Sequence, residues 1–148
     1  MDNYDIKILR LLHDNARITV KEISQKIHLS QPTCAERVKK LESNGIIQNY
    51  TTMIDWQSLG YNLSAIVRIR PLPSYLQRVE ALIQGMNNIS WCYKVTGDDA
   101  FICQLLIKSV TELDDCLSPI SQIAMTNTSI IKSAIVSNQF LDIETSFS

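Results

Sequence analysis

The sequence predicts an α+β protein, with three short helices at the N-terminus and a β-α-β-β-α-β unit after them. Two observations predict this order. In the N-terminal third, apolar residues recur every three or four positions, which is the period of a helix. In the rest of the chain, four stretches alternate with a period of two, and helical periods return between them. The 148 residues, 45% of them hydrophobic, suffice for one ordinary domain or two small ones.

Each N-terminal helix is marked by an apolar stripe and by a residue that caps it. Asp2 or Asn3 caps the first helix, Thr19 the second and Ser30 the third, because their side-chain oxygens accept hydrogen bonds from free backbone N–H groups. Gly45 is the expected stop of the third helix. The stripes are Ile6, Leu9 and Leu12; Val20, Ile23 and Ile27; and Cys34, Val38 and Leu41.

The break between the second and third helices is very short, which makes the pair a helix-turn-helix in a predicted domain 1–46. If the stripe of the third helix faces the core, polar and basic side chains face away and can contact base edges and phosphates of DNA. A solvated surface or a protein-docking module has the same pattern, so periodicity alone leaves these alternatives open. The candidate DNA-binding residues are Arg17, Lys21, Ser30, Gln31, Thr33, Glu36, Arg37, Lys39 and Lys40.

Residues 47–60 are predicted to form a linker strand and a turn, and residues 61–148 a second domain. Its order of elements is that of the ferredoxin-like βαββαβ fold. An antiparallel sheet of this kind is covered by two helices on one face and is open on the other. The predicted strands are 63–70, 89–95, 101–107 and 126–136, and the predicted helices are 76–86 and 113–120.

Several strand positions on the open face of this sheet are apolar, which predicts a covering partner. The simplest partner is the same sheet of a second copy, since most oligomers are symmetric homo-oligomers. The alternative is that the C-terminal tail, with Phe140, Leu141 and Ile143, folds over this face. The apolar residues expected on it are Ile66, Ile102, Leu106, Ile131 and Ile135.

The charge balance requires a local basic patch for any DNA binding, since the net charge of the chain is only -1. Residues 1–60 hold eight Lys and Arg against seven Asp and Glu, and the remainder holds six against eight. This small asymmetry has the sign that an N-terminal DNA-binding domain needs.

The sequence holds no catalytic set, phosphate loop or metal cluster, so we predict no enzyme, no cofactor and no metal. Four cysteines without C-x-x-C spacing are expected to be small buried hydrophobic residues. A signal peptide and an apolar run of about 20 residues are both lacking, which predicts a cytoplasmic protein without a membrane partner.

Six segments together resemble the Lrp/AsnC family, the feast/famine transcription regulators of bacteria and archaea. The stretch 29–42 is similar to the family's recognition helix, and the resemblance covers nearly the whole chain. The other segments are 5–9, 15–18, 45–47, 95–98 and 126–129. The resemblance implies a sequence-specific regulator that binds double-stranded DNA as a homodimer, or as a tetramer or octamer of stacked dimers.

The resemblance also implies a small effector, usually an amino acid, at dimer-dimer contacts near the loop between the middle strands. Its ammonium would bind Asp98, and backbone N–H groups or hydroxyls would bind its carboxylate. The candidate effector-binding residues are Thr96, Gly97, Asp98, Asp99, Ala100, Thr126 and Thr128.

This loop departs from the family pattern, because the aromatic residue after Asp98 is missing and the second acid is displaced by one position. Gly and Asp also favour simple turns, so a turn without a sensing role is the alternative for the loop. The alternative for the whole protein is an architectural DNA-wrapping protein with little sequence preference and no effector.

Overall fold

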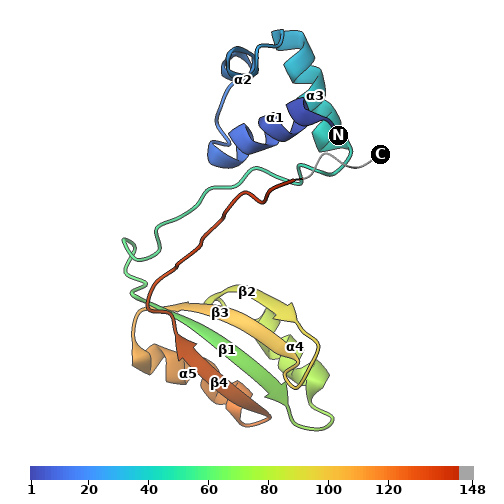
Figure 1. The fold of residues 1–148 in the computed structure, drawn as a ribbon. Helices are drawn as coiled ribbons and strands as arrows, with labels where there is room; N and C mark the ends of the chain where they lie inside the picture. The colour runs from blue at the N-terminus through green and yellow to red at the C-terminus, as the bar shows by residue number, and fades with distance from the viewer. Residues whose placement is uncertain (144–148) are drawn as a thin grey trace. The chain divides into compact units, whose positions relative to one another are not determined.

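The structure, a computed structural model, describes residues 1–143. Contacts divide the described chain into two compact units, shown as separate bodies in Figure 1. The helical unit contains residues 1–53 together with 136–143, and the sheet unit is Ile54–Ile135. No helix of the described residues is long and apolar enough to cross a membrane.

The helical unit consists of α1 (Asn3–Asp14), α2 (Val20–Ile27) and α3 (Gln31–Ser43), as the apolar stripes predict. Between α2 and α3 the turn is only three residues long, which confirms the helix-turn-helix. Its five buried apolar residues come from all three helices and include the Cys34 side chain, which is 0% exposed. These are Ile8, Ile23, Ile27, Cys34 and Leu41.

Caps fix the beginnings of all three helices at the residues that the sequence indicates. The Asp2 carboxylate caps α1, and Thr19 and Ser30 cap α2 and α3. Each accepts a hydrogen bond from the backbone N–H three residues later, which satisfies a donor that has no partner inside the helix. After α3, Gly45 has a φ of +70°, a conformation that glycine adopts without strain.

The sheet unit contains β1 (Leu63–Pro71), α4 (Leu76–Gln84), β2 (Ile89–Lys94), β3 (Phe101–Ile107), α5 (Val110–Ser121) and β4 (Ala124–Ile130). The strands pair antiparallel in the order β2-β3-β1-β4, which is the ferredoxin-like arrangement. Helices α4 and α5 cover one face of the sheet (Figure 1). Val67, Ile69 and Leu105 are fully buried between the sheet and these helices.

The open face of the sheet carries Ile66, Ile102 and Leu106, which are half-buried in a single chain. Beside them the ring of Tyr93, opposite Ile102 in the register, is 64% exposed. Ile131 and Ile135, which the sequence also placed on this face, lie beyond β4. The last strand therefore ends six residues before the predicted end at residue 136. The Ile131 N–H still donates to the Ser64 carbonyl at 2.8 Å, but β1 begins at Leu63, so residues after 132 have no partner in this register.

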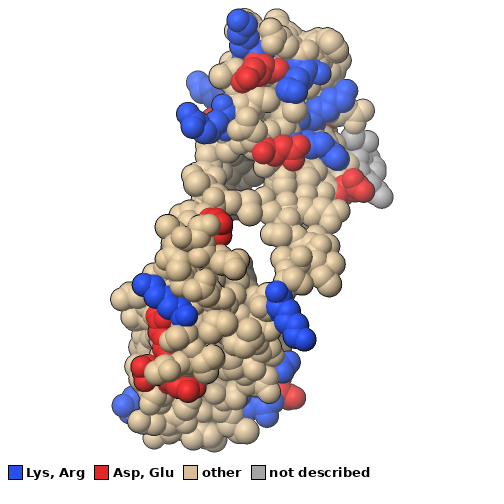
Figure 2. All heavy atoms as spheres, turned by 90° about the vertical axis from the view of Figure 1, so that its left-hand side faces the viewer, with Lys and Arg blue, Asp and Glu red and all other residues tan. Residues whose placement is uncertain are grey.

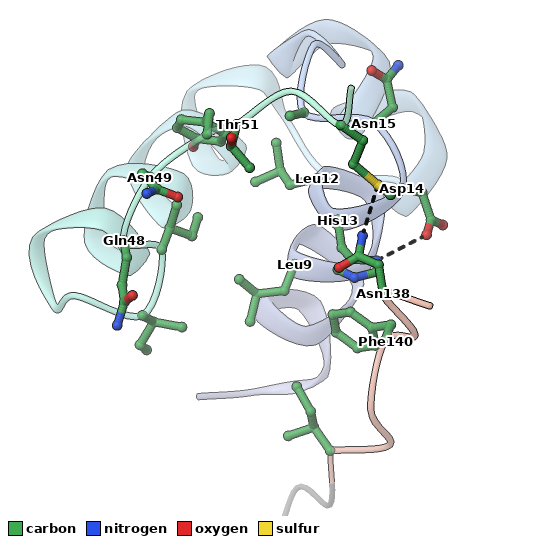
Figure 3. Close-up of a pocket in the computed structure, with 16 residues that line it drawn as sticks. Leu9, Leu12, His13, Asp14, Asn15, Gln48, Asn49, Thr51, Asn138 and Phe140 are labelled. Atoms are coloured by element: carbon green, nitrogen blue, oxygen red, sulfur yellow. Dashed lines mark hydrogen bonds and ion pairs between the residues drawn. The ribbon is translucent and has the colours of Figure 1, made fainter. Parts of the chain in front are cut away.

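The C-terminal tail, residues 136–143, belongs to the helical unit and not to the sheet unit. The Phe140 ring lies 5.3 Å from the His13 ring of α1, and the Arg10 guanidinium lies over Phe140 at 4.9 Å. Figure 3 shows Phe140 and Asn138 beside α1, where they line one side of a cavity of about 710 Å³. Asn138 donates a hydrogen bond to the Met53 sulfur at 3.7 Å.

This packing concerns the predicted bounds of the second domain. Its described residues group with the helical unit, whereas the second domain was expected to run from residue 61 through residue 148. The reason is that α1 leaves Leu9 and Leu12 only half-buried, which gives the tail an apolar surface on which to pack. Residues 144–148 of the predicted domain lie outside the described residues.

The four cysteines are free thiols. Cys34 and Cys103 are buried, as expected, whereas Cys92 and Cys116 are half-buried. Burial raises the pKa of the Cys103 thiol to about 12, so it stays protonated and packs as a small apolar group.

Candidate functional site

The outward surface of α3 is a polar helix face that follows the short turn of the helix-turn-helix. Gln31, Glu36, Lys39 and Lys40 are exposed on it, as expected from the buried positions of Cys34 and Leu41. In the first turn, the hydroxyl groups of Ser30 and Thr33, both exposed, lie 2.7 Å apart in a hydrogen bond. This face therefore offers amide, carboxylate, hydroxyl and ammonium groups along one helix.

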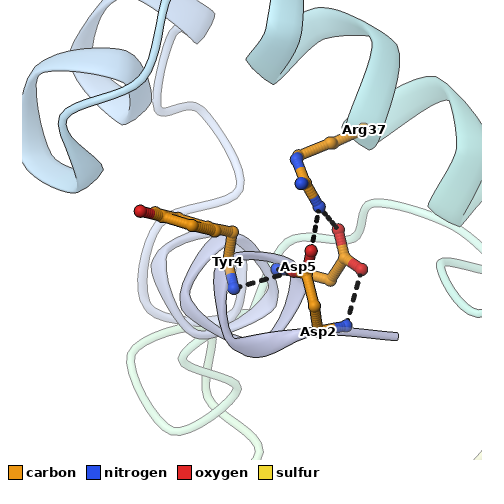
Figure 4. Close-up of polar contacts among 4 residues, drawn as sticks. All are labelled: Asp2, Tyr4, Asp5 and Arg37. Atoms are coloured by element: carbon orange, nitrogen blue, oxygen red, sulfur yellow. Dashed lines mark hydrogen bonds and ion pairs between the residues drawn. The ribbon is translucent and has the colours of Figure 1, made fainter.

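Arg37 differs from these neighbours, because its side chain turns away from the outward face and toward α1 (Figure 4). Its Nη1 donates hydrogen bonds to Asp2 Oδ2 and to Asp5 Oδ1, each at 2.8 Å. Its guanidinium also lies 5.6 Å from the ring centroid of Tyr4. The side chain is only 28% exposed. The expectation that Arg37 faces away from the core, beside the base-reading residues, is therefore wrong for this structure.

Helix geometry explains the orientation of Arg37. It lies three residues after Cys34 and four before Leu41, so it borders the buried stripe of α3. The hydrogen bonds that Arg37 donates to Asp5 and Asp2 favour its charged form and raise the pKa of the Arg37 guanidinium, with the Asp5 bond as the main cause. The pKa of Asp2 is lowered, mainly by the backbone N–H of Asp5 and further by Arg37. The cluster fastens α3 to the beginning of α1.

The remaining candidate phosphate-binding residues lie at the surface of the helical unit. Arg17 is exposed in the turn after α1, and Lys21 is exposed in the first turn of α2. Within residues 1–143, no ion pair involves Arg17, Lys21, Lys39 or Lys40, so their charges are not balanced by a neighbouring carboxylate. Figure 2 shows that Lys and Arg side chains gather on this unit, with some acidic side chains between them.

The loop between β2 and β3 turns at Gly97, whose φ of +107° disfavours any other residue. Thr96, Gly97 and Asp98 are exposed, and the Asp98 side chain is 90% exposed. Asp99 and Ala100 are half-buried, and the Ala100 N–H donates to the Ile69 carbonyl at 3.0 Å, which fixes the loop against β1. The two carboxylates therefore stand at the end of the sheet on an anchored loop.

A cavity of about 380 Å³ lies beside this loop on the sheet unit. The cavity brings Asp98, Asp99 and Thr126 together, as predicted, with basic and amide side chains that the prediction did not contain. Arg70 lies 3.6 Å from Asp98 and 3.9 Å from Asp99, measured between nitrogen and oxygen atoms. The full lining of the cavity is Arg68, Arg70, Asp98, Asp99, Met125, Thr126 and Asn127.

The other predicted effector-binding residues are not part of this lining, which omits Thr96, Gly97, Ala100 and Thr128. Thr128 lies opposite the buried Val67, so its side chain is directed to the helix-covered side of the sheet. The residues that sequence reasoning missed are Arg68, Arg70, Met125 and Asn127. The sequence held a signal for the arginines, because Arg68 and Arg70 are two basic residues at consecutive outward positions of a predicted strand.

Two family models match the two units in chain order. Residues 1–48 match a winged helix-turn-helix DNA-binding domain, and residues 64–140 match the Lrp/AsnC ligand binding domain. The chain is 33% identical over 135 residues to the transcriptional regulator LrpC of Bacillus subtilis, covering 91% of this chain and 94% of LrpC. The chain belongs to the Lrp/AsnC family. The regulator LrpA of Mycobacterium tuberculosis is 31% identical, over 95% of this chain and 92% of LrpA.

Solved structures of Lrp/AsnC proteins have the same fold. The structure of B. subtilis LrpC superposes with a TM-score of 0.86 at 33% identity, covering 93% of this chain and 98% of that one. A feast or famine regulatory protein from M. tuberculosis, complexed with L-methionine, gives a TM-score of 0.84 at 29% identity, over 95% and 97% of the two chains. The chain is thus an Lrp/AsnC transcriptional regulator with a DNA-binding helix-turn-helix and a ligand-binding domain.

Proposed function

We propose that this regulator reads DNA with the outward face of α3 and responds to an amino acid bound in the cavity beside the loop between β2 and β3. The observation that carries the first part is the exposed row of polar and basic side chains on α3, directly after the three-residue turn. Helices in this position of a helix-turn-helix enter the major groove with their N-terminal residues.

The residues of α3 divide by position along the helix. Gln31, Thr33 and Glu36 lie in its first two turns and are proposed to contact base edges. Lys39 and Lys40 follow further along and are proposed to contact phosphates, with Arg17 and Lys21 on the neighbouring segments. Ser30 supports this face as the cap of α3. Arg37 is proposed to hold α3 in place and not to read a base.

Fluorescence anisotropy with a duplex from the promoter region of the protein's own gene tests this assignment. The double variant Lys39→Ala/Lys40→Ala is expected to bind more weakly and with a salt slope reduced by about two, because two phosphate contacts are lost. The variant Lys132→Ala, an exposed lysine of the sheet unit, serves as the control. Unchanged affinity and salt slope in the double variant would show that another surface binds DNA.

The amino-acid effector is supported by the charges around the cavity and by the L-methionine complex of a related structure. The Asp98 carboxylate is exposed and is proposed to bind the ammonium group of the effector. Thermal shift measurements against the twenty L-amino acids test the proposal. At least one amino acid is expected to raise Tm, and this rise should be lost in Asp98→Asn. A panel without any response would contradict the effector role.

We also propose a homodimer formed through the apolar part of the open sheet face, where Ile66, Ile102 and Leu106 are half-buried in a single chain, and further assemblies of such dimers through other surfaces. Two linked copies would present two α3 helices at a fixed spacing, as a partly palindromic DNA site requires. Because the protein is proposed to bind DNA, we propose the cytoplasm as its location.

A further inference from the structure

The two arginines of the cavity stand on the open face of β1, since they alternate with the buried Val67 and Ile69. In the register with β4, Arg68 lies opposite Asn127, and Arg70 lies opposite Met125. Residues that face each other across an antiparallel pair share one side of the sheet. The sheet therefore places two guanidinium groups beside the loop that carries the two carboxylates.

The two guanidinium groups have different partners. Arg70 lies within 4 Å of both acids of the loop, so its charge is already balanced. Arg68 donates a hydrogen bond from Nη2 to the Asn127 side-chain oxygen at 2.9 Å, and it forms no ion pair within residues 1–143. Its only polar side-chain partner in the described part of the chain is thus neutral. Among the described residues, the cavity therefore holds one guanidinium without an ion-pair partner.

We infer that Arg68 binds the α-carboxylate of the amino-acid effector, with Asn127 holding the guanidinium in position. This inference rests on the proposed function, in which Asp98 binds the effector's ammonium group. An amino acid has one ammonium group and one carboxylate. Asp98 would balance the ammonium charge and Arg68 the carboxylate charge, while the ion pair between Arg70 and Asp99 stays intact. A guanidinium also matches a carboxylate with two parallel N–H···O bonds, which a hydroxyl group cannot offer.

This assignment adds a charged partner to those expected for the carboxylate. Backbone N–H groups or hydroxyls were expected to bind it. Thr128 lies opposite Val67, which points to the helix-covered side of the sheet, whereas Thr126 lines the cavity. Arg68 and Asn127 lie on the other side, which they share with the cavity. The specificity that follows is for a ligand with a free α-carboxylate beside its ammonium group.

The test removes the carboxylate from the ligand and the guanidinium from the protein in turn. Isothermal titration calorimetry on the full chain first identifies the tightest binder among the twenty L-amino acids, and then uses its α-amide, which keeps the ammonium group. Arg68→Gln is expected to weaken the affinity for the amino acid by about ten- to a hundredfold, because charged hydrogen bonds are lost. The same substitution should leave the weaker affinity for the α-amide unchanged.

Two further variants complete the test. Asn127→Asp keeps Arg68 but places a carboxylate beside it, which competes with the carboxylate of the ligand. The affinity for the amino acid should fall to a similar extent, and the affinity for the amide should not fall. Arg78→Gln, on the exposed surface of α4, is the control and should change neither affinity.

Equal losses for the amino acid and its amide in Arg68→Gln and Asn127→Asp would show a structural role for the pair and overturn the inference. If the parent binds an amino acid and its amide equally well, the carboxylate is not recognised, and the inference fails while the proposed effector role stands. If the parent binds no amino acid, the effector role fails and the inference fails with it.

Discussion

At the scale of single residues, Arg37 shows how one side chain on a DNA-binding helix can have a structural role. It lies in the middle of α3, yet both of its hydrogen-bonded partners belong to the first residues of the chain. The Asp5 side chain is only 17% exposed, so the loss of Arg37 would leave a partly buried carboxylate without a counter-charge. The Arg37 cluster should therefore contribute to the stability of the helical unit.

We expect Arg37→Met to lower the free energy of unfolding of the helical unit by about 1 to 2 kcal/mol, since charged hydrogen bonds are lost at a partly buried site. Urea unfolding followed by circular dichroism measures the change. Arg17→Met, at an exposed position, is the matched control and should leave stability near that of the parent. A variant that is as stable as the parent but no longer binds DNA would return Arg37 to the base-reading surface.

The lowered pKa of Asp2 gives this cluster a defined pH dependence. The ordinary pKa is 3.8, and the folded state lowers it, mainly through the Asp5 backbone N–H and further through Arg37. A lowered pKa means that the ionised form stabilises the folded state above the ordinary value, and that this stabilisation is lost as the pH falls through the folded-state pKa.

The stability difference between the parent and Asp2→Asn should therefore be constant between about pH 5 and 7 and should shrink below 3.8. Because asparagine is also a good cap, this variant keeps α1 while it removes the charge. Urea unfolding of both proteins across this pH range measures the difference. A difference that does not depend on pH would mean that the charge of Asp2 contributes nothing.

At the scale of elements, the helices and most strands could be predicted, because each has a local period and a local cap or turn. Thr19 and Ser30 define the beginnings of α2 and α3 without reference to the rest of the chain. The end of β4 could not be predicted in this way, because the length of β1 decides it. The packing partner of the tail could not be predicted for the same kind of reason. Its apolar residues show that it packs somewhere, but only the fold shows that α1 is the partner.

Phe140 anchors the tail, which makes it the residue to test. We expect Phe140→Ala to lower Tm of the helical unit and to reduce its stability by about 1 to 2 kcal/mol, below the cost of emptying a full core site, because the side chain is only half-buried. Leu141→Ala is the control, since that side chain is 76% exposed. Thermal unfolding followed by circular dichroism compares the two. An unchanged Tm in Phe140→Ala would show that the tail adds nothing to the unit.

At the scale of the whole molecule, the candidate sites could be predicted only in part. The α3 surface and the Gly97–Asp98 loop are continuous in sequence, so their residues could be named from spacing and resemblance. The cavity also needs Arg68 and Asn127, which are far apart in the chain and meet only through the register of β1 with β4. A net charge of -1 gives one copy little general attraction to DNA, which favours a regulator that binds as a pair.

The pairing surface is tested best at Ile66, which lies in β1 between Gln104 of β3 and Ser129 of β4, in the middle of the open face. In a symmetric dimer through this face, Ile66→Lys would bury two charges close to the twofold axis, where they repel each other and lose water. We expect the variant to sediment as a monomer at concentrations where the parent is a dimer.

The same variant should lose most of its affinity for a duplex with two half-sites while it keeps the weak affinity of the parent for a single half-site, because α3 is unchanged. Val110→Lys is the control, since Val110 is 61% exposed at the start of α5, on the side of the sheet that the helices cover. Sedimentation velocity and fluorescence anisotropy measure the two effects. A dimer that persists in Ile66→Lys, with full affinity for the paired half-sites, would show that copies associate through another surface.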